Sequence, residues 1–198
     1  MLGCEWLQYY LYSLIALLLG SVFYNLKQRQ IIQKRQESES ALIKKAYFNP
    51  LTDLPNKQNI EIMMDEQIHR AQRHKKTFVV AVIKILNYRD VLLRSQAVGE
   101  EFIVEAASRI SDSLREEDIL AHTTENGFVI LCNEYLEEDN SSIIFERISN
   151  AFQESFELNA KTILHFKISI GKAVYPKTAS TSESLINAAT REALKTSN

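Results

Sequence analysis

The chain contains few of the residues that most often dictate the architecture of a small protein. Its 198 residues include 5 glycines, 3 prolines and 2 cysteines. The cysteines, Cys4 and Cys132, lie far apart in the sequence, which indicates neither a disulfide framework nor a zinc site. Positive charge is not in excess, because 23 lysines and arginines face 25 aspartates and glutamates, and the net charge of -2 argues against nucleic-acid binding. With 45% hydrophobic residues, the chain can form one core plus an appendage.

The apolar run of membrane-spanning length lies at the amino terminus. From Trp6 to Leu26 there is no charged residue, and a helix of this length crosses the hydrocarbon core of a bilayer. Aromatic residues flank the run, and Lys27 and Arg29 follow it. We therefore expect residues 1–26 to form a single-pass anchor that leaves the rest of the chain in the cytoplasm. The alternatives are a cleaved signal peptide, which would carry its charges before the run, and a buried core helix, which would not need this length.

Residues 27–48 are charged and favour a helix. Apolar residues are present, but the heptad register that joins Ile32 to Ala46 places the charged Glu39 at the seam. The segment is therefore either a solvated linker helix or a short stalk that joins two copies of the chain into a homodimer.

The rest of the chain alternates between helical and strand patterns. Apolar residues at helical spacing predict helices, β-branched runs predict strands, and Asn126-Gly127 is a strong hairpin signal. The order β-α-β-β-α-β predicts a ferredoxin-like α/β (α+β) fold, with a central, mostly antiparallel sheet flanked by helices. The expected helices are 57–74, one around 102–114 that ends near Arg115, 141–156 and 182–195; the expected strands are 77–85, 118–122, 128–132 and 162–174.

Several of these segments match sequence motifs of one protein family. They are LTDLPNK (51–57), VIKILNYRDV (82–91), VGEEFIVEAASRI (98–110), LREEDILAH (114–122) and ISIGKAVYP (168–176). Together they make residues 49–198 resemble the GGDEF domain, a bacterial module that in active members joins two GTP molecules into cyclic di-GMP. The resemblance implies the palm-type nucleotidyl cyclase form of the fold. It also implies that the anchor would lie in the bacterial inner membrane.

The turn that gives the family its name has a different composition in this chain. By the resemblance its five positions are Thr124, Glu125, Asn126, Gly127 and Phe128. In the family, two leading glycines let the backbone approach the nucleotide, and here Thr124 and Glu125 add side chains and a negative charge. The third family position is an acidic metal ligand and the fourth is a glutamate, so Asn126 and Gly127 remove both carboxylates. We expect a vestigial signature turn.

Other positions of the family's site differ as well. Lys84 stands where the family has a metal-binding aspartate, and Mg²⁺ requires anionic oxygen ligands. Leu92 and Leu93 replace an Asn-Asp pair whose asparagine contacts guanine, while Glu100 resembles the second guanine contact. Thr190 replaces an aspartate of the last helix. Because these family residues are replaced, we expect no catalytic residue, no metal site and no cofactor.

One family motif is retained. Arg115 and Asp118 keep the RxxD pattern of the site at which the family binds its product, five residues before the signature turn. A guanidinium can pair with the Hoogsteen edge of guanine or with a phosphate, and a carboxylate can accept from guanine N–H groups. Arg147 matches a second arginine of that site more loosely. His122 is expected to be a surface residue at a strand edge.

The expected function is a catalytically inactive GGDEF domain that acts in cyclic di-GMP signalling at the membrane and binds cyclic di-GMP through Arg115 and Asp118. One alternative is a membrane-tethered scaffold that holds an unknown partner protein and binds no nucleotide. The other is a working diguanylate cyclase that recruits Glu125 or Asp90, which the site residues oppose.

Overall fold

The computed structural model describes residues 17, 20–21, 23–34, 41–132, 138–159 and 162–196. The chain divides into two compact units, Met1–Ala46 and Tyr47–Asn198. In the first unit, residues 23–34 and 41–46 are helical, and most of the predicted membrane anchor lies outside the described residues. No helix in the described ranges is long and apolar enough to cross a membrane.

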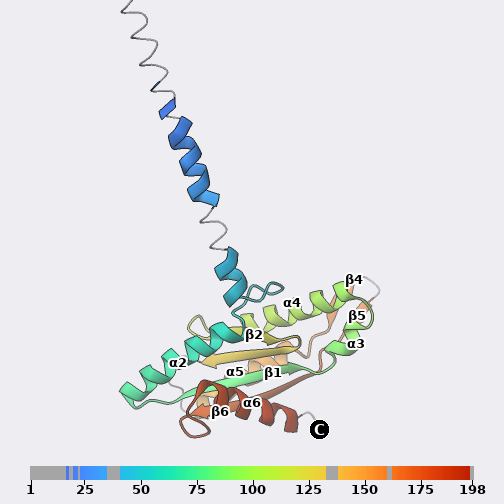
Figure 1. Cartoon of the computed structure of the whole chain (residues 1–198). Helices are drawn as coiled ribbons and strands as arrows, with labels where there is room; N and C mark the ends of the chain where they lie inside the picture. The colour runs from blue at the N-terminus through green and yellow to red at the C-terminus, as the bar shows by residue number, and fades with distance from the viewer. Residues whose placement is uncertain are drawn as a thin grey trace, which may run out of the picture. The chain divides into compact units, whose positions relative to one another are not determined.

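The second unit is built on a four-stranded antiparallel sheet with the strand order β2-β3-β1-β6 (Figure 1). The predicted fold class, an antiparallel sheet flanked by helices, is confirmed. The strands of this sheet are β1 (Phe78–Ile85), β2 (Ile119–Thr124), β3 (Gly127–Cys132) and β6 (Ile168–Tyr175).

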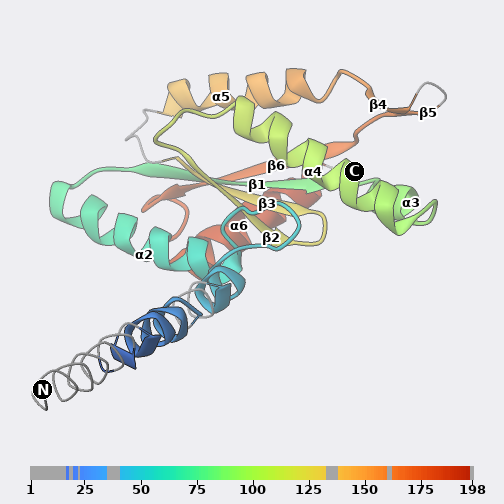
Figure 2. The same cartoon turned by 90° about the horizontal axis from the view of Figure 1, so that it is seen from above.

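Helices cover both faces of the sheet, which gives the unit two apolar cores (Figure 2). On one face, α2 (Lys57–His74) and α6 (Ser182–Thr196) pack against alternate residues of β1 such as Val80. On the other, α4 (Gln96–Asp112) and α5 (Glu138–Ala151) pack against the intervening residues such as Ala81. A short helix, α3 (Tyr88–Leu92), connects β1 to α4.

Local sequence signals explain the start and end of α2. The Asn56 side chain accepts a hydrogen bond of 3.0 Å from the Asn59 N–H, as expected of an N-cap. At the other end Lys75 adopts the left-handed conformation with φ 51°, and its N–H closes the helix on the Ala71 and Gln72 carbonyls. The predicted bounds of this helix are confirmed.

The segment from 141 to 174 differs from the prediction of one long helix followed by one long strand. Helix α5 ends at Ala151, and residues beyond it form a small hairpin of β4 (Phe156–Asn159) and β5 (Thr162–Leu164). The strand is interrupted because Phe166 is buried against Phe102, with ring centroids 4.0 Å apart, and because the Asn87 amide bonds the backbone of His165 and Lys167. Periodicity alone does not reveal such an interruption, since apolar and polar residues keep alternating across the break, as at Phe166, Lys167 and Ile168.

The hairpin that carries the signature turn is present, but its tip is displaced by one residue from the predicted Asn126-Gly127. Glu125 and Asn126 form the turn, and Thr124 pairs with Gly127. Gly127 does not have a positive φ. A Cβ atom at this position would lie 2.9 Å from Lys84 Nζ and would also meet Thr124 Oγ1, so the glycine serves close packing.

Candidate functional site

The end of the central strand lies beside the tip of the hairpin. Lys84 of β1 pairs with Gly127 of β3 in the sheet register. The Lys84 ammonium donates a hydrogen bond of 3.1 Å to the Thr124 hydroxyl. The Asn126 side-chain amide donates one of 2.9 Å to the Ile85 carbonyl, and the Ile85 N–H donates back to the Asn126 carbonyl at 2.9 Å. The signature turn is therefore fastened to the strand end by its own side chains.

The positions of the family's metal ligands do not fit a magnesium ion in this chain. Lys84 is half-buried, and burial lowers the pKa of its ammonium, which carries no lone pair for a metal while it is protonated. Asn126 uses its amide nitrogen as a donor to Ile85, and its side chain is neutral, so the second ligand position supplies no anionic oxygen. Within the described ranges, no group of three or more His, Cys, Asp or Glu side chains could hold a metal ion.

A cavity of about 300 Å³ lies beside the hairpin tip, between residues 49–51, α3 and the start of α4. Leu92 and Glu100 line it, whereas Leu93 is 87% exposed, so only one of the two replaced positions faces the cavity. The Glu100 carboxylate accepts a hydrogen bond of 2.7 Å from the Gln96 amide. Burial, and then the charges of Glu125 and Glu100, raise the pKa of Tyr88, another lining residue.

The prediction that His122 lies at the surface is wrong. The residue is 3% exposed, and its ring stacks on Phe128 with centroids 4.7 Å apart. Its backbone N–H donates to the Pro55 carbonyl at 2.9 Å, and its ring Nδ1 lies 3.2 Å from the Thr52 hydroxyl. Burial lowers the pKa of His122 more strongly than the neighbouring Glu125 and Thr124 carbonyls raise it. The loop of residues 49–56 covers β2 at this position. The sequence pattern did not predict this contact.

The retained RxxD motif forms a tight turn after α4, which ends at Asp112 and not near Arg115. The Asp118 N–H donates to the Arg115 carbonyl at 3.1 Å, and the Arg115 N–H donates to the Asp118 carboxylate at 3.2 Å. The Arg115 side chain is 39% exposed, and its guanidinium lies 3.9 Å from the Glu117 carboxylate. The turn thus holds Arg115 and Asp118 together through two hydrogen bonds and leaves the Arg115 side chain partly exposed.

The charged residues of the RxxD turn affect the pKa of Cys132, the last residue of β3. Burial raises the pKa of the Cys132 thiol to about 12, the Asp118 charge adds to this effect, and the Arg115 charge opposes it. Cys132 is therefore a protonated core residue.

Two other positions singled out in the sequence lie on other elements. Arg147 is exposed on α5, and Thr190 is half-buried on α6.

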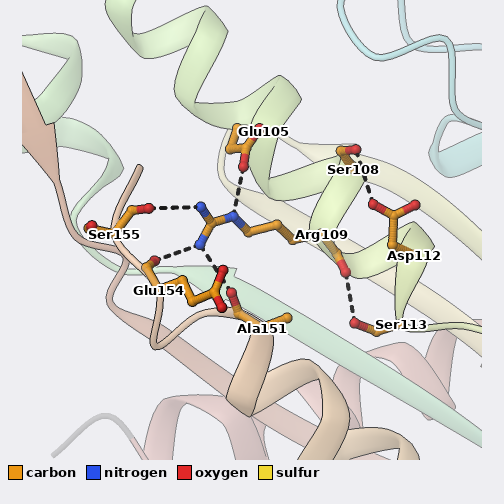
Figure 3. Close-up of polar contacts among 8 residues, drawn as sticks. All are labelled: Glu105, Ser108, Arg109, Asp112, Ser113, Ala151, Glu154 and Ser155. Carbon is orange, nitrogen blue, oxygen red and sulfur yellow. Dashed lines mark hydrogen bonds and ion pairs between the residues drawn. The ribbon is translucent and has the colours of Figure 1, made fainter. Parts of the chain in front are cut away.

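Arg109 was not predicted to have a role, although it organises the region between α4 and α5. Its side chain is 13% exposed and pairs with the Glu105 carboxylate at 2.8 Å. The guanidinium also donates to three backbone carbonyls (Figure 3). It lies over the Phe166 ring as well, 4.9 Å from the centroid. The carbonyls belong to Ala151 (3.0 Å), Glu154 (2.6 Å) and Ser155 (3.1 Å).

The antiparallel sheet, the helices on both its faces and the hairpin tip beside the central strand define a palm-type domain like those of nucleotidyl cyclases. Residues 46–197 match the family model described as "Diguanylate cyclase, GGDEF domain". The chain belongs to the GGDEF family.

Two relatives illustrate the similarity. Diguanylate cyclase TpbB of Pseudomonas aeruginosa is 26% identical over 153 residues, which are 77% of this chain and 35% of TpbB. The solved GGDEF domain of TpbB has a TM-score of 0.72 at 24% identity and covers 76% of this chain and 88% of that structure. The coiled coil and GGDEF domain of DgcB from Caulobacter crescentus were solved in complex with c-di-GMP. That structure has a TM-score of 0.72 at 16% identity, and the match covers 83% of this chain and 87% of that structure.

A third neighbour was solved with a protein bound. Diguanylate cyclase SiaD of Pseudomonas aeruginosa, in complex with its activator SiaC, has a TM-score of 0.71 at 20% identity and covers 98% of this chain and 73% of SiaD. The chain spans about a third of the length of TpbB. At these identities the solved structures establish the fold, whereas activity depends on the residues of the site.

Proposed function

We propose that this chain is a catalytically inactive GGDEF domain that acts in cyclic di-GMP signalling as a receptor. The observation that carries the inactivity is the hydrogen bonding at the strand end, where the Lys84 ammonium bonds Thr124 and the Asn126 amide bonds Ile85. Two-metal phosphoryl transfer needs carboxylate oxygens at these positions. An ammonium would repel a divalent cation, and Glu125 would repel the phosphates of a nucleotide.

Binding of cyclic di-GMP is assigned to the RxxD turn. The support is the pairing of Arg115 and Asp118 in one hydrogen-bonded turn, with the Arg115 side chain 39% exposed. A guanidinium in this position can bond guanine or phosphate and can stack on a purine. Glu117 lies 3.9 Å from the same guanidinium, so a ligand would have to displace this exposed ion pair, which costs little. Arg147 is proposed as a second contact.

The test is a calorimetric titration of cyclic di-GMP into the 198-residue chain, kept in solution with a mild detergent, at near-physiological salt. We expect micromolar or tighter binding that Arg115→Ala abolishes. Arg73→Ala, which removes an exposed arginine from the last turn of α2, is the matched control and should bind as the unaltered chain does. Absence of heat with all three proteins would overturn the proposal and favour a scaffold that binds a partner protein without a nucleotide.

The location of this domain at the inner face of the bacterial inner membrane is part of the proposal. It rests on the uncharged run from Trp6 to Leu26 and on the lysines and arginines that follow it. Fractionation of bacterial cells after washing with alkaline carbonate tests this location. The chain should stay with the membranes, and a variant without residues 1–26 should not; release of both proteins would contradict the anchor.

A further inference from the structure

The two edges of the four-stranded sheet differ in how they are covered. At the β2 edge, the backbone N–H of His122 donates to the Pro55 carbonyl, so the loop of residues 49–56 covers the strand. Strand β6 forms the opposite edge. An edge strand presents unpaired N–H and C=O groups that another chain can bond, and proteins usually cap or cover such groups.

The hydrogen bonds around β6 show which of its backbone groups point away from the sheet. Ile85, the partner of Ile168 in the register, uses both its N–H and its C=O in bonds to the hairpin turn on the β3 side. The backbone groups of Ile168 therefore point away from β1, and those of Ile170 and Lys172 do the same, because the direction alternates along an antiparallel strand. The Lys172 N–H agrees, since it donates to the Glu192 carboxylate at 2.7 Å.

Only part of this edge is capped by the chain itself. Glu192 caps the Lys172 N–H, and Thr178 bonds both backbone groups of Val174, through its hydroxyl at 3.1 Å and its N–H at 2.7 Å. The outward N–H and C=O groups of Ile168 and Ile170 have no hydrogen-bond partner among the residues that the structure describes. The open edge, defined as residues 168–170, thus offers donors and acceptors at the spacing of a β-strand.

A groove of about 400 Å³ is lined by the open edge, by α5 and by α6. On the α5 side it is lined by Phe145 and Glu146, and on the α6 side by Glu192. The Lys172 ammonium lies over the Phe145 ring, 6.0 Å from its centroid. The described lining residues carry two carboxylates and one ammonium, so the groove favours an occupant with positive charge.

A second copy of this chain does not fit the open edge. Helix α6 packs directly over β6, because a Cβ atom at Gly171 would meet the backbone of Ala189 and Ala193, and the Ser169 hydroxyl donates to the Ala193 carbonyl. Paired strands lie about 4.8 Å apart, whereas the axes of packed helices need about 8–10 Å. Pairing of two β6 strands would force the two α6 helices into each other, so the edge accepts an extended segment that has no helix over it.

We propose that the open edge of β6 binds an extended segment of a partner protein by strand addition. The backbone of that segment bonds Ile168 and Ile170, as in other cases where a peptide extends a sheet. In the segment, apolar residues alternate with arginine or lysine. The apolar side chains lie on the α5 side with Phe145, and the basic ones lie on the α6 side with Glu192. This site is separate from the RxxD turn and does not depend on cyclic di-GMP.

The probe is the peptide Val-Arg-Val-Arg-Val, blocked at both ends, labelled with a fluorophore and titrated into the detergent-solubilised chain. Fluorescence polarisation should show saturable binding. In the proposed pairing the valine N–H groups point toward β6 and the arginine N–H groups point away. N-methylation of the central valine should therefore weaken binding at least about fivefold, whereas N-methylation of one arginine, the matched control, should not. Replacement of both arginines by glutamate should also weaken binding at least about fivefold.

Changes in the chain test the same contacts from the other side. Ile170→Pro removes an outward N–H but no bond to β1, and it should weaken binding at least about fivefold. Glu146→Gln should weaken binding as well, and Glu101→Gln, which removes an exposed carboxylate from α4, is its matched control. Hydrogen exchange of the segment 168–172 should slow when the peptide is bound, because the N–H groups of Ile168 and Ile170 gain acceptors.

The peptide pair keeps the test decisive if Ile170→Pro does not fold, since it leaves the chain unaltered. No saturable binding, equal binding of the two N-methylated peptides, or equal binding of the glutamate peptide would each overturn the proposal. Sedimentation velocity distinguishes the remaining occupant. A dimer of the chain that Ile170→Pro dissociates would assign the open edge to a second copy and would also overturn the proposal.

Discussion

Lys84 and Thr124 join the central strand to the signature hairpin through a hydrogen bond of 3.1 Å between ammonium and hydroxyl. In active members of the family, the resemblance places a metal-binding aspartate at the lysine position and a glycine at the threonine position. This chain therefore fills the space between strand and hairpin with its own bonded side chains. This bonding supports the proposal that the chain does not assemble a metal site here.

A first prediction concerns catalysis. The 198-residue chain, incubated with GTP and either Mg²⁺ or Mn²⁺, should form no cyclic di-GMP, because Lys84 and Asn126 supply no anionic oxygen to a metal ion. Chromatography of the nucleotides after prolonged incubation is the measurement, and the diguanylate cyclase TpbB is the positive control. Formation of cyclic di-GMP that is lost in Glu125→Gln would show a working cyclase with a different set of acidic residues.

A second prediction concerns the structural role of Asn126. Asn126→Ala removes the donor to the Ile85 carbonyl and should lower the free energy of unfolding by about 1 kcal/mol, the usual value of one such hydrogen bond. Urea denaturation is the measurement. Glu125→Ala, at the neighbouring exposed turn position, should change stability by less than about 0.5 kcal/mol. Equal stability of both variants would mean that the Asn126 amide does not fasten the turn.

Sequence patterns predicted the fold well where each element depends on its own residues. Helix α2 follows from regular apolar spacing with an Asn cap, and β1 follows from a β-branched run that is buried on both faces. The patterns failed where a contact joins distant segments. The break before β6 depends on Phe166 packing against Phe102, and the burial of His122 depends on the loop that carries Thr52.

The position of the candidate site can be predicted from the family's sequence motifs, but the hydrogen bonds of its residues cannot. Replacement of the family residues at Lys84 and Asn126 is visible in the sequence, whereas their bonds to Thr124 and Ile85 are not. Arg109 gave no signal at all, because three of its partners are backbone carbonyls 42 to 46 residues away, and any residue type can supply a carbonyl.

A third prediction concerns Arg109. Arg109→Ala should lower the free energy of unfolding by about 3 kcal/mol, because it leaves Glu105 and the carbonyls after α5 without their charged donor. Arg109→Lys should recover less than half of the loss, since one ammonium cannot reproduce the planar fork of donors. Urea denaturation is again the measurement, with Arg73→Ala as the exposed control; a loss no larger than that of the control would exclude the structural role.

A fourth prediction concerns pH and follows from His122. Burial lowers the pKa of this ring in the folded chain, while the unfolded chain retains a value of about 6.5. Below that value the unfolded state binds the proton more readily than the folded state does, so His122 removes stability as pH falls from about 6.5 toward its lower folded pKa. The slope from one such group is at most about 1.4 kcal/mol per pH unit. Urea denaturation between pH 7.5 and 5 should show that the free energy of unfolding falls with this slope, which corresponds to the uptake of ~1 proton on unfolding. The slope should be smaller in His122→Phe, which keeps a ring beside Phe128.

His74→Gln, which removes an exposed histidine at the end of α2, is the matched control variant. A slope that survives in His122→Phe would assign the pH dependence to other groups and would contradict a neutral, buried His122.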